Sequence, residues 1–529
     1  MLGFELSPAA ATRHPTQTPL AAFFRHGGGT SVAIAEGPDG GLTLWSEVGP
    51  GHAACLQLDN NDTATRLSWR ETMIIALRKV YPVGALTLTG SWSRLQSSGS
   101  GLAGSFTGNR AVSTSAPSAV ASVTVDRAEP YDVWVHYTAR TNGGYVKVEI
   151  DGAQTLVTGI ADPANLGFKA FPTYSATDMQ RRRTIQVASG LTGVHEISLS
   201  LGGTANPGGN AILLEAVSIS GTLSDPYVMP PVWQPSTPYE MGDEVQLGGV
   251  FYSARGDGNS GVDGPSHITG IASDGALDWR ADNRPTYPEF VTIDYASERE
   301  FAARFATAGI ATEVGGQTHG NEALTARVIT VDGVAWTPAD GFVVGQEIAI
   351  TEQTLWRTQS GLDVATCQLH RRVEAGTIRH DVTLTGLGPQ VDMEWFYAGM
   401  LPMVRWDGEQ KANVVDRVWA PTGGPVVLDD FSGVSPPNVG FPGVSRPGLS
   451  GTALMTPFLY GHEAGALPIA GNQIGALEAF LRPNLDARIA GGNLDWGAKA
   501  YVALVSPEAV SFGDGDVVGF FNRHVISVG

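Results

Sequence analysis

Apolar and polar residues alternate along much of this chain, in short runs separated by glycine-rich turns. Residues 131–137 read Tyr-Asp-Val-Trp-Val-His-Tyr, and residues 194–201 read Val-His-Glu-Ile-Ser-Leu-Ser-Leu. A period of two places successive side chains on opposite faces of a strand. The chain also has 67 glycines and 32 prolines without a Gly-x-y period, which favours many turns between short strands. The pattern therefore predicts an all-β protein.

Two segments carry helix signals. Ser68-Trp69-Arg70-Glu71 fits a capping box, although so few residues fit the start of a strand equally well. Ser297-Glu298-Arg299-Glu300 precedes Phe301, Ala302 and Phe305, and this spacing predicts one short capped helix.

A chain of 529 residues is too long for one hydrophobic core, so several domains are expected. The hairpin signal Asp151-Gly152 lies inside a run of alternating strands, whereas Pro226, Pro230 and Pro231 form a stiff linker. We predict four parts: an N-terminal region at 1–89, a β-sandwich at 90–223, a small aromatic module at 224–284 and a large strand-rich domain at 285–529.

Charge and cysteine content exclude several classes of protein. The net charge of −19 disfavours nucleic acid as a partner. The N-terminus has no basic and apolar signal pattern, and no apolar run approaches the length of a membrane span. We therefore expect synthesis in a cytoplasm and no membrane insertion. Cys55 and Cys367 fit neither a metal site nor a disulfide framework, so two buried free thiols are predicted.

Four aromatic residues lie within about fifty residues, around a Gly-Asp turn and a short alternating strand. A unit of this size cannot bury a large aliphatic core, so aromatic packing must hold it together. The pattern resembles the small chitin-binding type of carbohydrate-binding module, similar copies of which occur in bacteriophage tail proteins. The resemblance implies sugar contact by aromatic rings, although at least two of the four must be core: Trp233, Tyr239, Tyr252 and Trp279.

The segment 90–223 resembles jelly-roll carbohydrate-binding modules and the related golvesin-like domains, through Gly-x-Trp at 90–92, the alternating strand at 131–137 and Gly-x-His at 193–195. Trp134 alternates with Val133 and Val135, so it lies on the outer face if those valines are core. An outer tryptophan on a sheet is either a sugar-contacting ring or an interface with the next domain or subunit.

The segment 285–529 contains Tyr397-Ala398-Gly399-Met400-Leu401-Pro402, which resembles a strand of the supersandwich domains of phage tail proteins. These domains are similar to the sandwiches of polysaccharide lyases. A lyase would need a Tyr or His base and an arginine for a uronate, and Tyr397, His380, His319 and Arg405 lie in this segment. We expect Tyr397 in the core and His380 at the rim.

Other signs of catalysis are missing from the sequence. The helical domain that precedes such lyase sandwiches has no counterpart here, and sequence does not bring together the carboxylates of Asp381, Glu394 and Asp407. His319 with Glu322, and His462 with Glu463, are isolated pairs that solvent usually surrounds. We therefore predict no enzyme activity, no catalytic residue, no metal site and no cofactor.

Together the resemblances imply a receptor-binding or tail-fibre protein of a tailed bacteriophage or a phage-derived particle, located on the virion. It would adsorb to host surface polysaccharide through Trp233, Tyr239, Tyr252, Trp279 and Trp134. By analogy with phage fibres, the N-terminal region 1–89 would attach to the particle, the protein would be a homotrimer, and its partners would be other tail or baseplate proteins. Two alternatives remain: a polysaccharide-degrading tailspike or lyase, and a purely structural virion component such as a head fibre, neck whisker or baseplate spacer.

Overall fold

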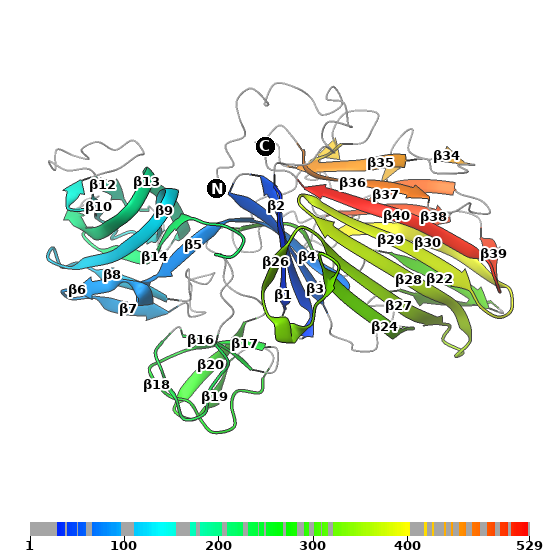
Figure 1. Cartoon of the computed structure of the whole chain (residues 1–529), viewed down its shortest axis with the longest axis horizontal. Coiled ribbons are helices and arrows are strands. Elements are labelled where there is room, and N and C mark those ends of the chain that lie inside the picture. The colour runs from blue at the N-terminus through cyan, green and yellow to red at the C-terminus, as the bar shows by residue number, and fades with distance from the viewer. Residues whose placement is uncertain are drawn as a thin grey trace. The chain divides into compact units, whose positions relative to one another are not determined.

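The computed structural model divides the chain into two compact units, one comprising residues 1–75 and 290–529 and the other residues 76–289. Figure 1 shows both as assemblies of β-strands. The structure describes residues 29–37, 40–49, 51–59, 66–96, 110–154, 170–175, 180–203, 209–225, 231–241, 243–247, 250–267, 271–282, 290–295, 301–307, 309–315, 321–402, 417–419, 426–427, 439–440, 446–447, 454–461, 468–476, 484–491, 498–505 and 509–526.

The described residues contain strands and two short 3-10 turns, η3 (Val83–Ala85) and η6 (Pro338–Asp340), and no α-helix. The predicted all-β, multi-domain fold class is confirmed. Ser68 begins a strand, so of the two structures that the sequence allowed for residues 68–71, a helix start and a strand, the strand is the one found. The second helix prediction is wrong where the structure describes it, because Ala302–Thr307 is also a strand. The backbone of this strand pairs with residues 310–314 on one edge and with residues 391–402 on the other, and such pairing overrides a local capping signal.

The first unit contains a six-stranded sheet that joins the beginning of the chain to later segments. Its order is β21-β4-β3-β2-β1-β26. In that order the strands are β21 (Phe290–Tyr295), β4 (Ser68–Ala76), β3 (His52–Asp59), β2 (Leu42–Gly49), β1 (Val32–Glu36) and β26 (Val343–Gly345).

A ten-stranded sheet of the same unit has the order β25-β24-β27-β28-β29-β40-β36-β35-β31-β32. These strands are β25 (Val334–Ala335), β24 (Glu322–Val331), β27 (Ile348–Arg357), β28 (Asp363–Glu374), β29 (Thr377–Gly386), β40 (Val517–Ile526), β36 (Pro468–Ala476), β35 (Leu454–Gly461), β31 (Arg417–Trp419) and β32 (Val426–Val427).

An eight-stranded sheet completes the strands of this unit. It comprises β23 (Ile310–Val314), β22 (Ala302–Thr307), β30 (Val391–Pro402), β38 (Ala498–Val505), β37 (Asn484–Gly491), β33 (Val439–Gly440), β34 (Arg446–Pro447) and β39 (Val510–Phe512). One core unites residues from all three sheets, including Ile34, Leu56, Phe305, Trp356 and Phe520.

The predicted N-terminal domain at 1–89 is not a separate body. Its strands β1 to β4 belong to the six-stranded sheet of the first unit, whereas residues 78–82 and 87–89 pair with strands of the second unit. The correction has a physical reason: strands with two buried faces, such as β1 and β2, need covering elements that a short segment cannot supply alone.

The second unit holds the predicted jelly-roll segment, built around two long strands. The central order is β11-β10-β13-β9-β14-β8-β7, and β12, β5 and β6 pair with β10, β14 and β9. The strands are β11 (Ala153–Gln154), β10 (Tyr145–Ile150), β13 (Gln180–Gly203), β9 (Val120–Ala139), β14 (Ile212–Ser220), β8 (Arg110–Thr114), β7 (Ser93–Gln96), β12 (Ala170–Pro172), β5 (Arg78–Pro82) and β6 (Thr87–Thr89).

The small aromatic module has its own sheets within the second unit. A four-stranded sheet comprises β16 (Glu244–Leu247), β17 (Val250–Ala254), β20 (Leu277–Asp282) and β19 (Ile271–Asp274), and a two-stranded one comprises β15 (Pro238–Tyr239) and β18 (Gly258–Asn259). Its core is a separate cluster centred on Trp279, Tyr252 and Val245.

Candidate functional site

Three of the predicted sugar-contacting aromatic residues form the core of the small module. Trp279 is 0% exposed, Tyr252 2% and Trp233 7%. The Tyr252 hydroxyl donates to the His267 carbonyl at 2.8 Å, so its polar end is also satisfied internally. A buried ring cannot stack on a sugar, which corrects the prediction for these three residues. The reason is size: besides these three rings, the buried members of the described core are only Val245, Val250, Ala254 and Leu277, so the rings supply most of its volume.

Tyr239 is the one predicted aromatic residue of this module that keeps part of its surface exposed. Its ring meets the edge of Trp279 at a centroid distance of 5.1 Å. Its hydroxyl accepts a hydrogen bond from the Gln234 backbone N–H at 2.9 Å. Both contacts hold the ring against the module, so only its outer portion is available to a ligand.

Trp134 lies on the outer face of its strand, as the alternation predicts. Val133 and Val135 are both 0% exposed and belong to the core of the jelly-roll segment. The Arg78 guanidinium carbon lies 3.5 Å from the centre of the Trp134 ring system. That cation–π contact occupies the ring with a neighbour from β5, so the prediction of an open sugar platform is corrected here too.

A serine and a histidine lie on the same face as Trp134. His136 Nε2 is 2.7 Å from Ser218 Oγ, and Nδ1 is 3.0 Å from Thr184 Oγ1. The arrangement has the hydrogen-bond order of a nucleophile and its base. Ser218 is however 0% exposed and His136 1%, so no substrate reaches the hydroxyl in this structure. The pair instead satisfies buried polar groups.

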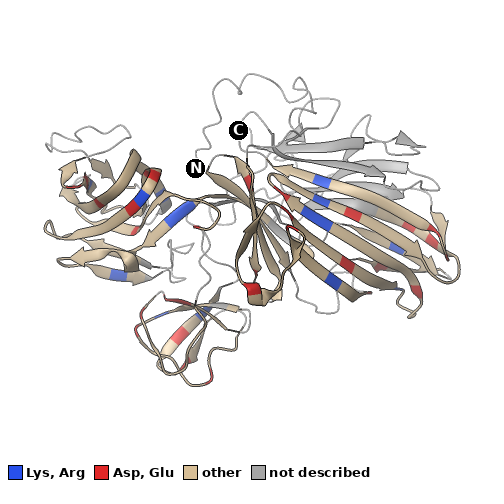
Figure 2. Ribbon diagram, in the orientation of Figure 1, with Lys and Arg blue, Asp and Glu red and all other residues tan. Residues whose placement is uncertain are grey.

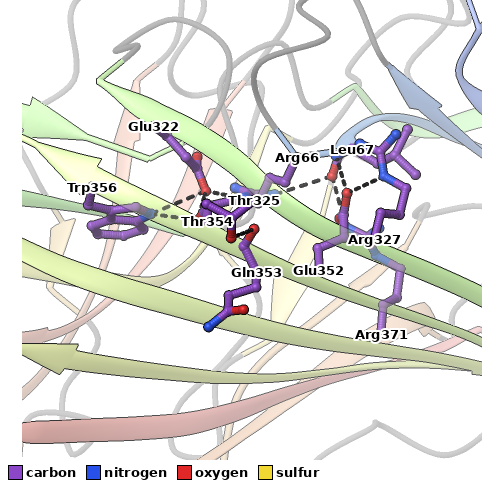
Figure 3. A network of polar contacts seen from close by, with 10 residues as sticks. All are labelled: Arg66, Leu67, Glu322, Thr325, Arg327, Glu352, Gln353, Thr354, Trp356 and Arg371. Carbon is purple, nitrogen blue, oxygen red and sulfur yellow. Dashed lines mark hydrogen bonds and ion pairs between the residues drawn. The ribbon is translucent and has the colours of Figure 1, made fainter.

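A denser buried polar network lies in the first unit, against the inner face of β24, β27 and β28. Figure 3 shows how its side chains converge. Glu352 Oε1 accepts from the Leu67 backbone N–H at 2.9 Å and from Arg327 Nε at 2.7 Å. The Arg371 Nη2 group donates to the Leu67 carbonyl at 3.3 Å. Both backbone polar groups of Leu67 are thus bound by side chains of the sheet.

Glu322 is the second carboxylate of this network. Its Oε1 accepts from Thr354 Oγ1 at 2.8 Å and from Trp356 Nε1 at 3.2 Å, and it lies 3.4 Å from Arg66 Nε. Neither side chain of the Arg66–Glu322 pair is exposed. Because neither Glu322 nor Glu352 has exposed side-chain surface, the two carboxylates cannot meet a ligand. The network attaches residues 66 and 67 to the sheet.

His380, predicted at a strand rim, is instead 1% exposed on the inner face of β29. Its ring lies 5.4 Å from Trp69 and 5.8 Å from His524. The rim prediction is wrong because His380 lies two residues from Ile378 and two from Val382, so all three side chains share one face of the strand and face the core. The side chains of Tyr397, His319, Arg405 and Asp407 lie outside those that the structure describes. The same holds for the core position predicted for Tyr397 and for any pairing of Asp407 with Glu394.

The outer face of β27, β28, β29 and β40 is open and polar. Strand register places side chains directly opposite one another in two neighbouring rows. We call these rows the polar rows. The first comprises Thr351, His370, Asp381 and Phe521, and the second Gln353, Gln368 and Thr383.

Within the polar rows, Gln353 and Gln368 are exposed and the other members half-buried. Thr351 Oγ1 and His370 Nδ1 are 2.9 Å apart. Phe521 is the aromatic member, and the Arg379 guanidinium carbon lies 4.7 Å from its ring centre. The opposite faces of these strands are packed into the core, for example at Leu369, Val382 and Phe520, so the backbone beneath the rows is held firmly.

Basic and acidic residues lie beside the polar rows. Figure 2 shows Lys and Arg bands, with Asp and Glu bands among them, on neighbouring strands of the ten-stranded sheet. Arg372 Nε contacts Glu347 Oε2 at 3.1 Å, and Arg379 Nε contacts Asp381 Oδ1 at 2.7 Å. Sequence reasoning missed this face. Alternation signals a solvent-facing side on each strand, but only the register brings the sides together.

Among the residues that the structure describes, no group of three or more His, Cys, Asp or Glu side chains is placed to hold a metal ion. The same residues include no helix with the length and apolarity that crossing a bilayer requires.

No protein-family model matches this sequence, and no curated protein matches it. Among solved structures, the chain is similar to a CBM36 domain of a xylanase from the hindgut metagenome of Trinervitermes trinervoides. The identity is 16%, the coverage 27% of this chain and 98% of that one, and the TM-score 0.20. For a CBM36 carbohydrate-binding module in complex with calcium and xylotriose, the identity is 14%, the coverage is 27% of this chain and 98% of that one, and the TM-score is 0.19. For an exo-β-1,3-galactanase from Phanerochaete chrysosporium, the identity is 12%, the coverage is 33% of this chain and 42% of that one, and the TM-score is 0.21.

Proposed function

We propose that this chain binds a surface polysaccharide without cutting it, through the polar rows on the outer face of β27, β28, β29 and β40. The observation that carries the proposal is the composition of that face. Hydroxyl and amide groups of Thr351, Gln353, Gln368 and Thr383 lie in register on β27, β28 and β29, and Phe521 ends the first row on β40. Such groups both donate and accept hydrogen bonds, which is what sugar hydroxyls require.

An open face suits a polymer better than a small molecule. Small ligands are usually held in concave pockets that bury most of their surface, whereas a polysaccharide presents hydroxyl groups along its whole length. The polar rows offer partners on adjacent strands spaced about 4.8 Å apart. An aromatic ring such as Phe521 adds apolar contact with the face of a pyranose. The firm packing beneath the strands limits the ordering cost of binding.

The role on a particle is the finer part of the proposal, and the sequence resemblance to phage tail proteins supports it. In this role the chain is a tail-fibre or receptor-binding component of a tailed bacteriophage or phage-derived particle, assembled as a homotrimer. A single open sugar site binds weakly. Several copies on one particle make later contacts intramolecular and raise avidity by about 10² to 10⁴.

The test measures binding of the full chain to purified surface polysaccharides by surface plasmon resonance. The double substitution Phe521→Leu with Gln368→Ala is expected to weaken binding about tenfold or more, because it removes ring contact and an amide partner. Gln234→Ala, at an exposed glutamine of the small module, is the matched control and should leave binding unchanged. Unaltered binding by the double variant would contradict the proposed face.

The same samples separate the alternatives. Release of reducing ends or of an unsaturated product from the polysaccharide would point to the degrading tailspike. Failure of the parent chain to bind any surface polysaccharide would favour the purely structural role.

A further inference from the structure

Three arginines stand directly opposite one another across three adjacent strands. Arg372 of β28 pairs in register with Arg379 of β29, and Arg379 pairs with Arg523 of β40. Directly opposed residues of antiparallel strands place their side chains on the same face. This arginine ladder, defined as Arg372, Arg379 and Arg523, therefore forms a third row next to the polar rows, about 7 Å along the strands.

A ladder of like charges is costly, because directly opposed like charges destabilise a sheet. Carboxylates offset part of this cost, since Glu347 contacts Arg372 and Asp381 contacts Arg379, in both cases at the Nε atom. Among the described residues, the hydrogen bond of Arg379 to Asp381 is made at Nε, and the terminal nitrogens of Arg372 and Arg379 form no hydrogen bond. These nitrogens therefore keep hydrogen-bonding capacity for a ligand on the open face.

The third member of the ladder, Arg523, is partly removed from solvent. Burial lowers the pKa of its guanidinium from the ordinary value, whereas the nearby Glu374 carboxylate raises this pKa and the Arg379 charge lowers it to a smaller extent. Arg523 Nη2 also lies 3.5 Å from Thr377 Oγ1. An anion bound near Arg379 and Arg523 would offset the repulsion between these two opposed charges.

We propose that the arginine ladder is the subsite for the carboxylate or sulfate groups of an acidic polysaccharide, whose hydroxyls occupy the adjoining polar rows. The proposal rests on the proposed function and names its substrate class. Guanidinium groups bind carboxylates bidentately and form charge-assisted hydrogen bonds with the oxygens of tetrahedral oxyanions such as sulfate, and the terminal nitrogens of Arg372 and Arg379 are the ones available. Phe521, 4.7 Å from Arg379, places an apolar ring contact beside the charged one.

The net charge of −19 does not forbid this ligand. At physiological ionic strength charges farther apart than about 8 Å are largely screened. An anion on the ladder therefore responds chiefly to the guanidinium groups that it touches. Its binding is expected to weaken as salt rises further, because the remaining contacts are charge-assisted and exposed.

The experiment uses the full chain with three immobilised glycans: polygalacturonate for carboxylate, dextran sulfate for sulfate, and neutral dextran. The double variant Arg372→Gln with Arg523→Gln removes two ladder charges without touching Arg379 or Phe521. Its affinity for at least one acidic glycan is expected to fall about tenfold or more. The acidic glycan that shows the loss identifies which anionic group is bound.

Arg357→Gln is the matched control. Arg357 is a half-exposed arginine on β27 that pairs with Asp363 at 2.6 Å, away from the ladder. Replacing Arg357 makes the net charge more negative, as the double variant does, but should leave the affinity for acidic glycans unchanged. An equal loss in this control, or unchanged affinity in the double variant, would overturn the acidic subsite. Urea unfolding of each variant shows whether the fold is kept.

The outcomes for the two proposals are separable. If the double variant binds acidic glycans as the parent does, while Phe521→Leu with Gln368→Ala still weakens polysaccharide binding, the ladder proposal fails and the proposed function stands. If the parent binds none of the glycans and no surface polysaccharide, both fail.

Discussion

Arg66 Nε lies 3.4 Å from Glu322 Oε1, and neither side chain has exposed surface. The guanidinium of Arg66 also lies over the Phe301 ring, at 4.1 Å from its centre. Residue 66 precedes β4, and residue 322 begins β24, so the pair joins segments separated by about half of the chain. A buried pair with extra hydrogen bonds specifies one arrangement of these segments.

Replacing Glu322 by alanine is expected to lower the free energy of unfolding by about 3–5 kcal/mol, because a buried arginine loses its carboxylate. Thr354 and Trp356 would lose an acceptor as well. Urea unfolding measures the change. Glu394→Ala is the control, since its pair with Arg304 is half-exposed and worth about 1 kcal/mol or less. A loss at Glu322 no larger than at Glu394 would refute the argument.

Trp279→Ala should destabilise the small module by about 3–5 kcal/mol, the usual cost of deleting a buried aromatic side chain. Hydrogen exchange of residues 243–282 in the full chain is the measurement, and their protection should fall. Tyr239→Phe removes only the hydroxyl that accepts the Gln234 N–H, and about 1 kcal/mol is expected. Full protection in the Trp279 variant would show that its ring is not the core.

Acid should weaken the contact between Asp151 and β13. The backbone N–H of Glu196, then His195, lower the pKa of the Asp151 carboxyl below its ordinary value of 3.8. The stability that this carboxylate contributes is therefore present above pH 3.8 and is lost as pH falls through the lower folded value.

Asp151→Asn tests this expectation and suits the backbone, because Asn also tolerates the positive φ of 51° found here. Denaturant midpoints between about pH 5 and pH 2 should depend less on pH in the variant than in the parent. Identical pH profiles would mean that Asp151 keeps its ordinary pKa.

Both cysteines should resist thiol reagents in the folded protein. Cys55 and Cys367 are buried thiols outside any disulfide, as predicted, and burial raises the pKa of the Cys367 thiol well above its ordinary value of 9.0. Since the thiolate is the reactive species, Ellman's reagent at pH 8 is expected to detect no thiol before denaturation and both afterwards. Rapid labelling of the native chain would contradict this packing.

Much of the local structure follows from the sequence because a period of two is a local property. Alternation predicts the strand at 131–137, the inward valines and the outward Trp134, and the structure agrees. The chain also shows that capping signals alone are insufficient, since Ser68 and Ala302 both begin strands. Side-chain pattern identifies a strand and its two faces, but not the element that covers each face.

The sequence by itself determined an all-β chain with two buried thiols and a small module held together by aromatic packing. Only the tertiary structure decided that β1 to β4 belong with residues 290–529, that Trp279 is core, and that Arg372, Arg379 and Arg523 form a row. The physical reason is that pairing and register depend on contacts between distant segments. A shift of one residue would turn each of these arginines to the opposite face.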